Sequence, residues 1–249
     1  MTDVAIKITG LGFGYPAQDK LLFSHLDLSV RKGERFGLFG PNGAGKTTLM
    51  SLMTGLLQYQ QGDIELDGHT ISPDHKDANK LFGFVPQDIS LYEELTPVEN
   101  LAFFGAWYGL DKIQVRKRTE MLLEILNLTN VGNKAVHTFS GGMKRRVNLA
   151  IGVIHNPDIV FLDEPTVGVD VQTRHDIINY LKQLNQQGTT LVYTSHQLNE
   201  AEELCNKIAL IDQGKIIVHD QLNVLLEQHQ QDGLEGLFLQ LTGKGYTDS

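Results

Sequence analysis

The sequence predicts an α/β fold in which a mostly parallel sheet carries a phosphate-binding loop. Residues 35–39 have the apolar pattern of a buried strand, and a Gly-rich stretch leads from them into a helix at 48–53. Residues 158–163 form a continuous apolar run that ends in acids, as expected for a central parallel strand. Residues 97–155 are helical in pattern. The length of 249 residues fits one large α/β domain or two small ones.

Composition and charge narrow the class of protein. Apolar residues make up 41% of the chain and charged residues 20%, which is ordinary for a soluble globular protein. A net charge of −9 and a pI near 5.4 argue against a nucleic-acid binder, which needs a basic face. The single cysteine, Cys205, has no Cys or His companions at metal-ligand spacing, so a reducing, cytosolic setting is expected.

Targeting and membrane signals are not found in the sequence. The first residues lack the basic and apolar regions of a signal peptide. No apolar run approaches the roughly 18 residues that a membrane span requires. We therefore expect any membrane role to come through a partner.

The N-terminal part predicts short strands. Residues 4–8 and 26–30 alternate like half-buried strands on either side of a turn-rich stretch at 12–19, and residues 62–68 form another short strand closed by Asp-Gly. Tyr15 lies in the turn-rich stretch. Taken alone, a tyrosine in a turn is a packing residue at the edge of the core.

The phosphate-loop pattern G-x-x-x-x-G-K-[ST] is filled at every fixed position. Its residues are Gly40, Pro41, Asn42, Gly43, Ala44, Gly45, Lys46 and Thr47. The glycines allow successive backbone N–H groups, with the positive end of the following helix, to surround a phosphate. We expect the Lys46 ammonium to contact the terminal phosphates and the Thr47 hydroxyl to ligate Mg²⁺.

Gln87 follows the next predicted strand, at 80–85. Its neutral amide is placed to reach a metal or a water in a cleft, although a surface glutamine is the commoner case. Thr96 and Glu99 then form a capping box that predicts the start of a helix. We expect most of the aromatic rings on that helix to face the core and any exposed remainder to form a docking surface. These rings belong to Phe103, Phe104, Trp107 and Tyr108. The apolar stripe from Met121 to Leu128 is also expected in the core.

Ser140, Gly141 and Gly142 open another helix, which runs to Ile154. Two interpretations of this segment stay open. Ser140 is a good N-cap, and two glycines allow a tight entry to the helix. The same Ser-Gly-Gly also exposes N–H donors and a hydroxyl, which would make a second anion site.

Two acids and a histidine end the later strands. Asp163 and Glu164 follow the apolar run, and adjacent acids point in different directions, so they can have separate roles. Asp163 suits Mg²⁺, directly or through water, and Glu164 suits orienting or deprotonating an attacking water. After a helix at 173–186 and a strand at 189–194, His196 is expected to reach the γ-phosphate. The hairpin at 208–218 and the helical, then polar, end of the chain carry no chemistry that we can identify.

Taken together, these motifs resemble an ATP-binding cassette (ABC) ATPase, and the resemblance covers essentially the whole chain. The phosphate loop, Gln87, the Ser-Gly-Gly signature, the Asp163-Glu164 strand end, the loop at 169–170 and His196 occur in the family's order. The resemblance implies ATP and Mg²⁺ as cofactors. It assigns Tyr15 to stacking on adenine, Thr48 to the nucleotide site beside Thr47, and Mg²⁺ to Thr47, Gln87 and Asp163. It assigns catalysis to Glu164, His196 and Lys46.

The resemblance also implies an architecture and a second cassette. The chain would be a single nucleotide-binding domain with a phosphate-loop core at about 1–87 and 159–220, an N-terminal antiparallel β subdomain, an inserted helical subdomain at about 88–158 and a tail at about 221–249. Cassettes of this family pair head to tail around two ATP molecules. The nucleotide of the neighbour would then be contacted by Ser140, Gly141 and Gly142. Asp170 would lie at the interface between the two cassettes, and Gln87 would be the hinge to the helical subdomain.

One departure from the family pattern is the signature, which reads Phe-Ser-Gly-Gly-Met instead of Leu-Ser-Gly-Gly-Gln. Met143 cannot make the hydrogen bonds that a glutamine would make at this position. This variant is similar to the single-cassette bacterial branch (ABC-2 type) that exports drugs and lipids. It implies an ATPase subunit that powers a separate membrane permease, lies on the cytoplasmic face of the membrane through that partner, and has no nucleic-acid partner. The alternatives are an importer ATPase and a soluble ABC ATPase that acts on ribosomes or nucleic acid.

Overall fold

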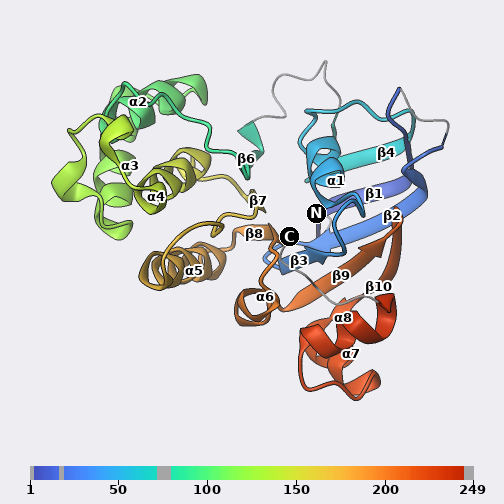
Figure 1. The fold of residues 1–249 in the computed structure, drawn as a ribbon. Helices are drawn as coiled ribbons and strands as arrows, with labels where there is room; N and C mark the ends of the chain where they lie inside the picture. The colour runs from blue at the N-terminus through green and yellow to red at the C-terminus, as the bar shows by residue number, and fades with distance from the viewer. Residues whose placement is uncertain (1–2, 17–19, 72–79, 244–249) are drawn as a thin grey trace.

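The computed structural model describes residues 3–16, 20–71 and 80–243, which form two sheets and several groups of helices (Figure 1). The elements, in chain order, are β1 (Val4–Phe13), β2 (Phe23–Arg31), β3 (Arg35–Phe39), α1 (Lys46–Met53), β4 (Gln61–Leu66), β5 (His69–Thr70), β6 (Phe82–Val85), α2 (Pro97–Trp107), α3 (Lys112–Ile125), the 3₁₀ turns η2 (Thr129–Val131) and η3 (Val136–Thr138), α4 (Gly141–Val153), β7 (Ile159–Asp163), α5 (Val171–Gln186), β8 (Thr190–Thr194), α6 (Leu198–Leu204), β9 (Lys207–Asp212), β10 (Lys215–Gln221), α7 (Leu222–Gln228) and α8 (Leu234–Thr242).

The larger sheet has the strand order β10-β9-β3-β8-β7-β6. All of its neighbouring strands run parallel except the hairpin of β9 and β10, so the predicted mostly parallel sheet is confirmed. Both faces of the sheet are covered. Along β7, Ile159 and Phe161 belong to one apolar core, whereas Val160 and Leu162 belong to the other. Burial on both faces explains why this strand is a continuous apolar run.

The smaller sheet has the order β2-β1-β4-β5 and is antiparallel throughout, as predicted for the N-terminal part. The strands extend beyond the predicted ranges 4–8 and 26–30. Gly10 has a φ of +60°, and the pairing of β1 with β2 shifts between Ile8 and Leu11. This irregularity ends the simple alternation in the sequence although the strand continues. Part of the turn-rich stretch, residues 17–19, lies outside the described residues.

Between β6 and β7 the described residues form only helices and turns, at the left of Figure 1, and α4 packs against β6 and the core of the larger sheet. Because β6 and β7 are neighbours in the sheet, this helical segment is an insertion between adjacent strands. The capping box of Thr96 and Glu99 is present at the start of α2. The exact subdomain boundaries stay a prediction.

The expectation that most α2 aromatic rings face the core is wrong. Trp107 is 70% exposed and Phe103 44% exposed, whereas Phe104 and Tyr108 are partly buried. A helix turns by 100° per residue, so rings at these spacings cannot all lie on the one face that α2 packs inward through Leu101. Met121 is likewise exposed, although it belongs to the predicted stripe.

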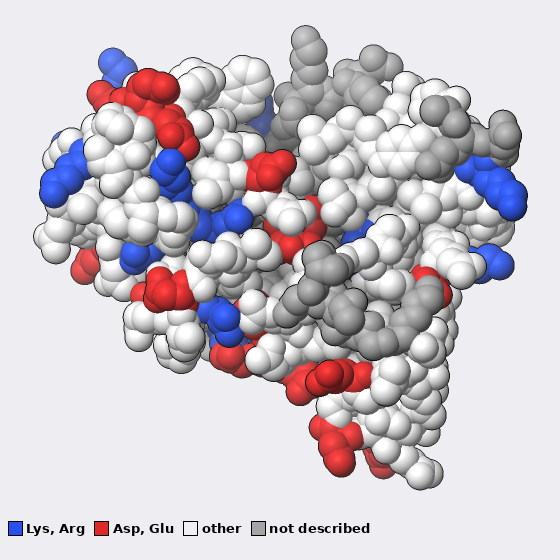
Figure 2. Space-filling view, viewed as in Figure 1, with Lys and Arg blue, Asp and Glu red and all other residues white. Residues whose placement is uncertain are grey.

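The C-terminal helices α7 and α8 form a small lobe (Figure 1) that buries Leu234, Leu237 and Phe238. Residues 222–243 contain Glu227, Asp232 and Glu235 but no Lys or Arg. On the face drawn in Figure 2, acidic side chains accordingly predominate over this lobe, whereas both signs are interspersed over the helical segment. No helix within the described ranges is long and apolar enough to cross a membrane.

Candidate nucleotide-binding site

A cleft of about 500 Å³ lies at the carboxyl ends of the parallel strands and is lined by residues far apart in the sequence. They are Tyr15, Leu22, Asn42, Gly43, Gly45, Lys46, Thr47, Thr48, Gln87, Glu164 and His196. The carboxyl ends of parallel strands meet at one edge of a sheet, which brings the phosphate loop, Gln87, Glu164 and His196 together. A larger hollow of about 870 Å³ lies between α6 and α8. Of the residues that line this hollow, only His196 also lines the cleft. The phosphate loop, Gln87 and Glu164 line the cleft alone, so the residues with predicted chemical roles gather in the smaller cavity.

The phosphate loop joins β3 to α1 and needs glycine for two different reasons. A Cβ on Gly40 would lie 2.0 Å from the Ile211 carbonyl oxygen, so this position has no room for a side chain. Gly43 and Gly45 have φ values of +78° and +107°, which L side chains rarely adopt. Among the described residues, nothing lies within 4 Å of a Cβ placed on Gly43. The loop is therefore open toward the cleft and closed toward β9.

Lys46 is folded back onto its own loop. Its Nζ donates to the carbonyl oxygens of Gly40 at 2.7 Å and Pro41 at 3.2 Å, and the residue is 7% exposed. Burial lowers the pKa of Lys46, and the carboxyl groups of Glu164 and Asp163 act in the opposite direction. The ammonium is thus held at the cleft wall by neutral acceptors, which a phosphate oxygen can replace with a charge-assisted bond.

Glu164 and His196 form a close pair in the cleft. His196 Nε2 lies 2.6 Å from Glu164 Oε1. The other oxygen, Oε2, is buried and has no hydrogen-bond partner within the part of the chain that the structure describes. Burial raises the pKa of Glu164, and the neighbouring His196 opposes this effect. One oxygen is thus fixed by the histidine, and the other is left to accept a bond from a bound group.

Thr194, at the end of β8, orients both acids. Its hydroxyl donates to Asp163 Oδ1 at 2.6 Å, and Glu164 N donates to its carbonyl oxygen at 3.2 Å. The Asp163 carboxylate thus accepts from Thr194, whereas the Glu164 carboxylate contacts His196, and their separate roles stay a prediction. Asp163 is 2% exposed and is not among the residues that line the cleft. Thr194 is a site residue that the sequence motifs do not reveal, although it lies two residues before His196.

Tyr15 and Thr48 lie together at one end of the cleft, with their hydroxyl groups 2.9 Å apart. The Tyr15 ring is 38% exposed and packs edge-on against Phe13, with ring centroids 5.0 Å apart. Its place on the cleft fits the ligand contact that the family resemblance implies better than core packing. Leu22 also lines the cleft. Nothing in the sequence distinguished it from other strand-edge leucines.

Ser140, Gly141, Gly142 and Asp170 do not line the cleft. The Ser140 hydroxyl accepts from Met143 N at 3.3 Å, which confirms the capping interpretation. A Cβ on Gly142 would lie 3.5 Å from Asp170 Oδ2, so the starts of α4 and α5 are adjacent. Hydrogen bonds from Thr173 lower the pKa of Asp170, which caps α5. The anion role of this segment stays a prediction that requires a second chain.

The chain is similar to several curated ATP-binding proteins. It is 45% identical over 198 residues to the linearmycin resistance ATP-binding protein LnrL of Bacillus subtilis (strain 168), covering 80% of this chain and 64% of that protein. A Nod factor export ATP-binding protein I of Cupriavidus pinatubonensis is 40% identical over 209 residues, covering 84% of this chain and again 64% of the relative. The daunorubicin resistance ATP-binding protein DrrA3 of Streptomyces coeruleorubidus is 36% identical over 255 residues, covering 98% of this chain and 80% of the relative.

Solved structures show the same fold. The structure of an ATP-binding subunit of an ABC transporter matches with a TM-score of 0.87 and 27% identity, covering 96% of this chain and 99% of the other. A dimeric ATP-binding cassette in a post-hydrolysis state, bound to ADP and Pi, matches with a TM-score of 0.79 and 26% identity, covering 87% and 98%. Residues 23–167 match the family described as ABC transporter. The chain therefore belongs to the ABC transporter family and contains its nucleotide-binding ATPase domain.

Proposed function

We propose that this chain binds and hydrolyses ATP to power a membrane exporter of a drug, a lipid or another amphipathic small molecule. The observation that carries the ATPase proposal is the buried, unpartnered Glu164 Oε2 in the same cleft as Lys46 and the open phosphate loop. The relatives support export, since they are named for linearmycin resistance, daunorubicin resistance and Nod factor export.

The cleft fits a nucleoside triphosphate. The open backbone at Gly43 accepts phosphate oxygens, Lys46 exchanges its loop carbonyls for them, and the half-exposed Tyr15 ring offers a stacking face for adenine. Thr47 and Gln87 line the same cavity and, together with Asp163, would hold Mg²⁺. When bound, the ion would neutralise charge on the phosphates.

Glu164 is the proposed general base. Burial raises its pKa, which makes the carboxylate a better proton acceptor than an ordinary glutamate. His196 holds Oε1, so Oε2 is the oxygen that would receive the proton of the attacking water. For His196 to contact the γ-phosphate as proposed, its ring would have to share or leave its contact with Glu164 Oε1.

Glu164→Gln tests this assignment. The substitution keeps the shape of the side chain and removes its basicity, so turnover should fall by about 100-fold or more. ATP binding, measured by isothermal titration in the presence of Mg²⁺, should remain. Hydrolysis by this variant at the wild-type rate would show that Glu164 is not the base.

A second cassette completes the proposed site. Ser140, Gly142 and Asp170 lie together outside the cleft of their own chain, where they can face the nucleotide of a partner. A homodimer or a heterodimer satisfies this geometry. If this chain pairs with itself, the ATPase rate per subunit should rise with protein concentration. A constant, full rate in a proven monomer would contradict the dimer requirement.

The membrane partner is a separate permease, and the chain would lie on the cytoplasmic face through that contact. The exposed rings of Tyr92, Phe103 and Trp107 offer a docking surface in the helical segment. Purification in mild detergent should recover a transmembrane subunit with this chain. Recovery of a permease together with a solute-binding protein would indicate an importer instead, and recovery of ribosomes or DNA would indicate a soluble ATPase.

A further inference from the structure

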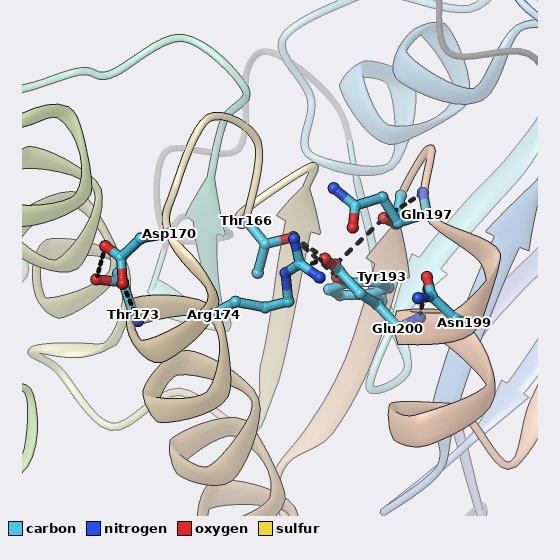
Figure 3. A network of polar contacts seen from close by, with 9 residues as sticks. Thr166, Asp170, Thr173, Arg174, Tyr193, Gln197, Asn199 and Glu200 are labelled. Atoms are coloured by element: carbon cyan, nitrogen blue, oxygen red, sulfur yellow. Dashed lines mark hydrogen bonds and ion pairs between the residues drawn. The ribbon is translucent and has the colours of Figure 1, made fainter.

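Glu200 is a buried carboxylate outside the cleft, on the short helix α6 that follows His196. It is 3% exposed. Its Oε2 accepts hydrogen bonds from the Thr166 hydroxyl at 2.5 Å, the Tyr193 hydroxyl at 2.8 Å and the Ser195 hydroxyl at 3.4 Å (Figure 3). Three donors therefore converge on one oxygen atom, one from the loop after β7 and two from the end of β8 and the turn that follows it.

The other oxygen faces a cation. Arg174 reaches from α5 toward the cluster (Figure 3), and its Nε lies 2.8 Å from Glu200 Oε1 as an ion pair rather than an aligned hydrogen bond. Burial and the Glu200 carboxylate raise the pKa of Tyr193, so its hydroxyl stays protonated and remains a donor. A buried carboxylate is costly unless it is paired and hydrogen-bonded, and here both conditions are met.

Two partners of Glu200, Ser195 and Thr166, belong to loops that carry residues of the proposed nucleotide site. Ser195 precedes His196, and its hydroxyl accepts from Gln197 N at 2.9 Å, which fixes the turn that carries the histidine. Thr166 lies in the loop that runs from Glu164 to the helix cap Asp170. The shared oxygen Oε2 thus joins the His196 loop to the loop at 165–170 within one chain.

We propose that Glu200 is a positioning residue that holds these two loops in a fixed relation, and so couples the contact of His196 with Glu164 to the position in which Asp170 is presented to a second cassette. This inference rests on the proposed function. A displacement of the 165–170 loop pulls the Thr166 hydroxyl away from the oxygen that also orients Ser195. Contact at the interface between the two cassettes is thereby transmitted to Glu164 and His196 through the Glu200 carboxylate.

The test compares Glu200→Gln with Glu203→Gln. Glu203 lies on the same helix and also binds a cation of α5, with 2.7 Å to Lys182 Nζ, but its side chain is 48% exposed. No contact of Glu203 with either loop is found among the described residues. We expect Glu200→Gln to lower kcat about 10-fold or more while the dissociation constant for Mg-ATP changes less than about 2-fold. Glu203→Gln should leave both values unchanged.

A second measurement separates positioning from folding. In the Glu164→Gln background, ATP should drive dimer formation, and adding Glu200→Gln should raise the protein concentration needed by about 10-fold in sedimentation experiments. Thr166→Val removes one donor without changing the shape of the side chain, so it should lower kcat in the same way even if Glu200→Gln does not fold.

The outcomes distinguish the two proposals. Wild-type kcat and wild-type dimerisation in Glu200→Gln, or in Thr166→Val if the first variant does not fold, would overturn the role of Glu200. A loss of kcat matched by an equal loss of ATP affinity would also overturn it. If the wild-type chain itself fails to hydrolyse ATP under these conditions, the proposed function fails instead.

Discussion

The Arg145 side chain, in α4, donates to the backbone carbonyl oxygen of Gln87, with Nη1 2.5 Å from that oxygen. The same nitrogen lies 3.4 Å from the Pro86 carbonyl, and the residue is 7% exposed. Burial lowers the pKa of Arg145, while Asp88 and Glu164 oppose the shift. Helix α4, which begins after Ser140, is therefore bonded to the loop that carries Gln87, which lines the cleft.

Arg145→Met should release the Gln87 loop and lower turnover. The substitution keeps the apolar stem but leaves two carbonyl groups without this donor, at a cost of about 1–3 kcal/mol in the free energy of unfolding. We expect kcat to fall about 10-fold, because the loop would no longer be fixed. Steady-state ATPase assays and thermal unfolding measure the two effects.

Arg146→Met is the matched control, since Arg146 Nη1 donates to the Leu126 carbonyl at 3.0 Å, away from the cleft. It should lose similar stability and keep its turnover. Equal losses of turnover in both variants would indicate that the Arg145 contact has no special relation to the site.

The raised pKa of Glu164 predicts an acid limb in the pH profile of kcat. The base acts only when ionised, so kcat at saturating Mg-ATP should fall as the pH drops below a midpoint higher than the ordinary value of 4.5. His196→Gln should move that midpoint further upward, because the histidine favours the ionised form. A midpoint at or below the ordinary value would contradict the burial effect. Circular dichroism at each pH checks that the protein stays folded.

His155 predicts a pH dependence of stability. Its ring stacks on Tyr108 at 3.7 Å, and burial lowers its pKa from 6.5 to about 4. Above pH 6.5 both states are neutral and the stabilisation is complete. Below that value the unfolded chain binds a proton that the folded chain takes up only near pH 4, so stability falls across this window by about 3 kcal/mol.

Urea unfolding between pH 7 and pH 4 measures this contribution. His155→Phe keeps an aromatic ring for the stack and cannot titrate. The free energy of unfolding of the wild type, relative to that of the variant, should therefore decrease as the pH falls. An unchanged pH slope in the variant would assign the effect to other groups.

Gly40→Ala should disrupt the phosphate loop. The new Cβ would lie 2.0 Å from the backbone oxygen of Ile211, which cannot move without displacing β9. We expect a loss of about 3 kcal/mol in the free energy of unfolding, together with weaker ATP binding. Gly141→Ala is the stability control, because nothing among the described residues lies within 4 Å of its Cβ. Equal melting temperatures for the two variants would contradict the packing argument.

The sequence by itself determined the phosphate loop, the mostly parallel sheet and the order of the motifs. These features depend on local rules. Glycines at fixed spacing permit one backbone path from Gly40 to Lys46, and a strand buried on both faces, such as β7, must be apolar throughout. The resemblance to ABC ATPases followed from that order and is confirmed by the family match.

Only the tertiary structure decided which side chains share a contact. Thr194 between the two acids, Arg145 on the Gln87 carbonyl and Glu200 between two loops each join residues at least five positions apart in sequence, where periodicity gives no signal. The exposure of Trp107 also depended on how much of α2 its neighbours cover. Local pattern specifies a strand, a loop or a helix face, whereas partners are specified by where those elements pack.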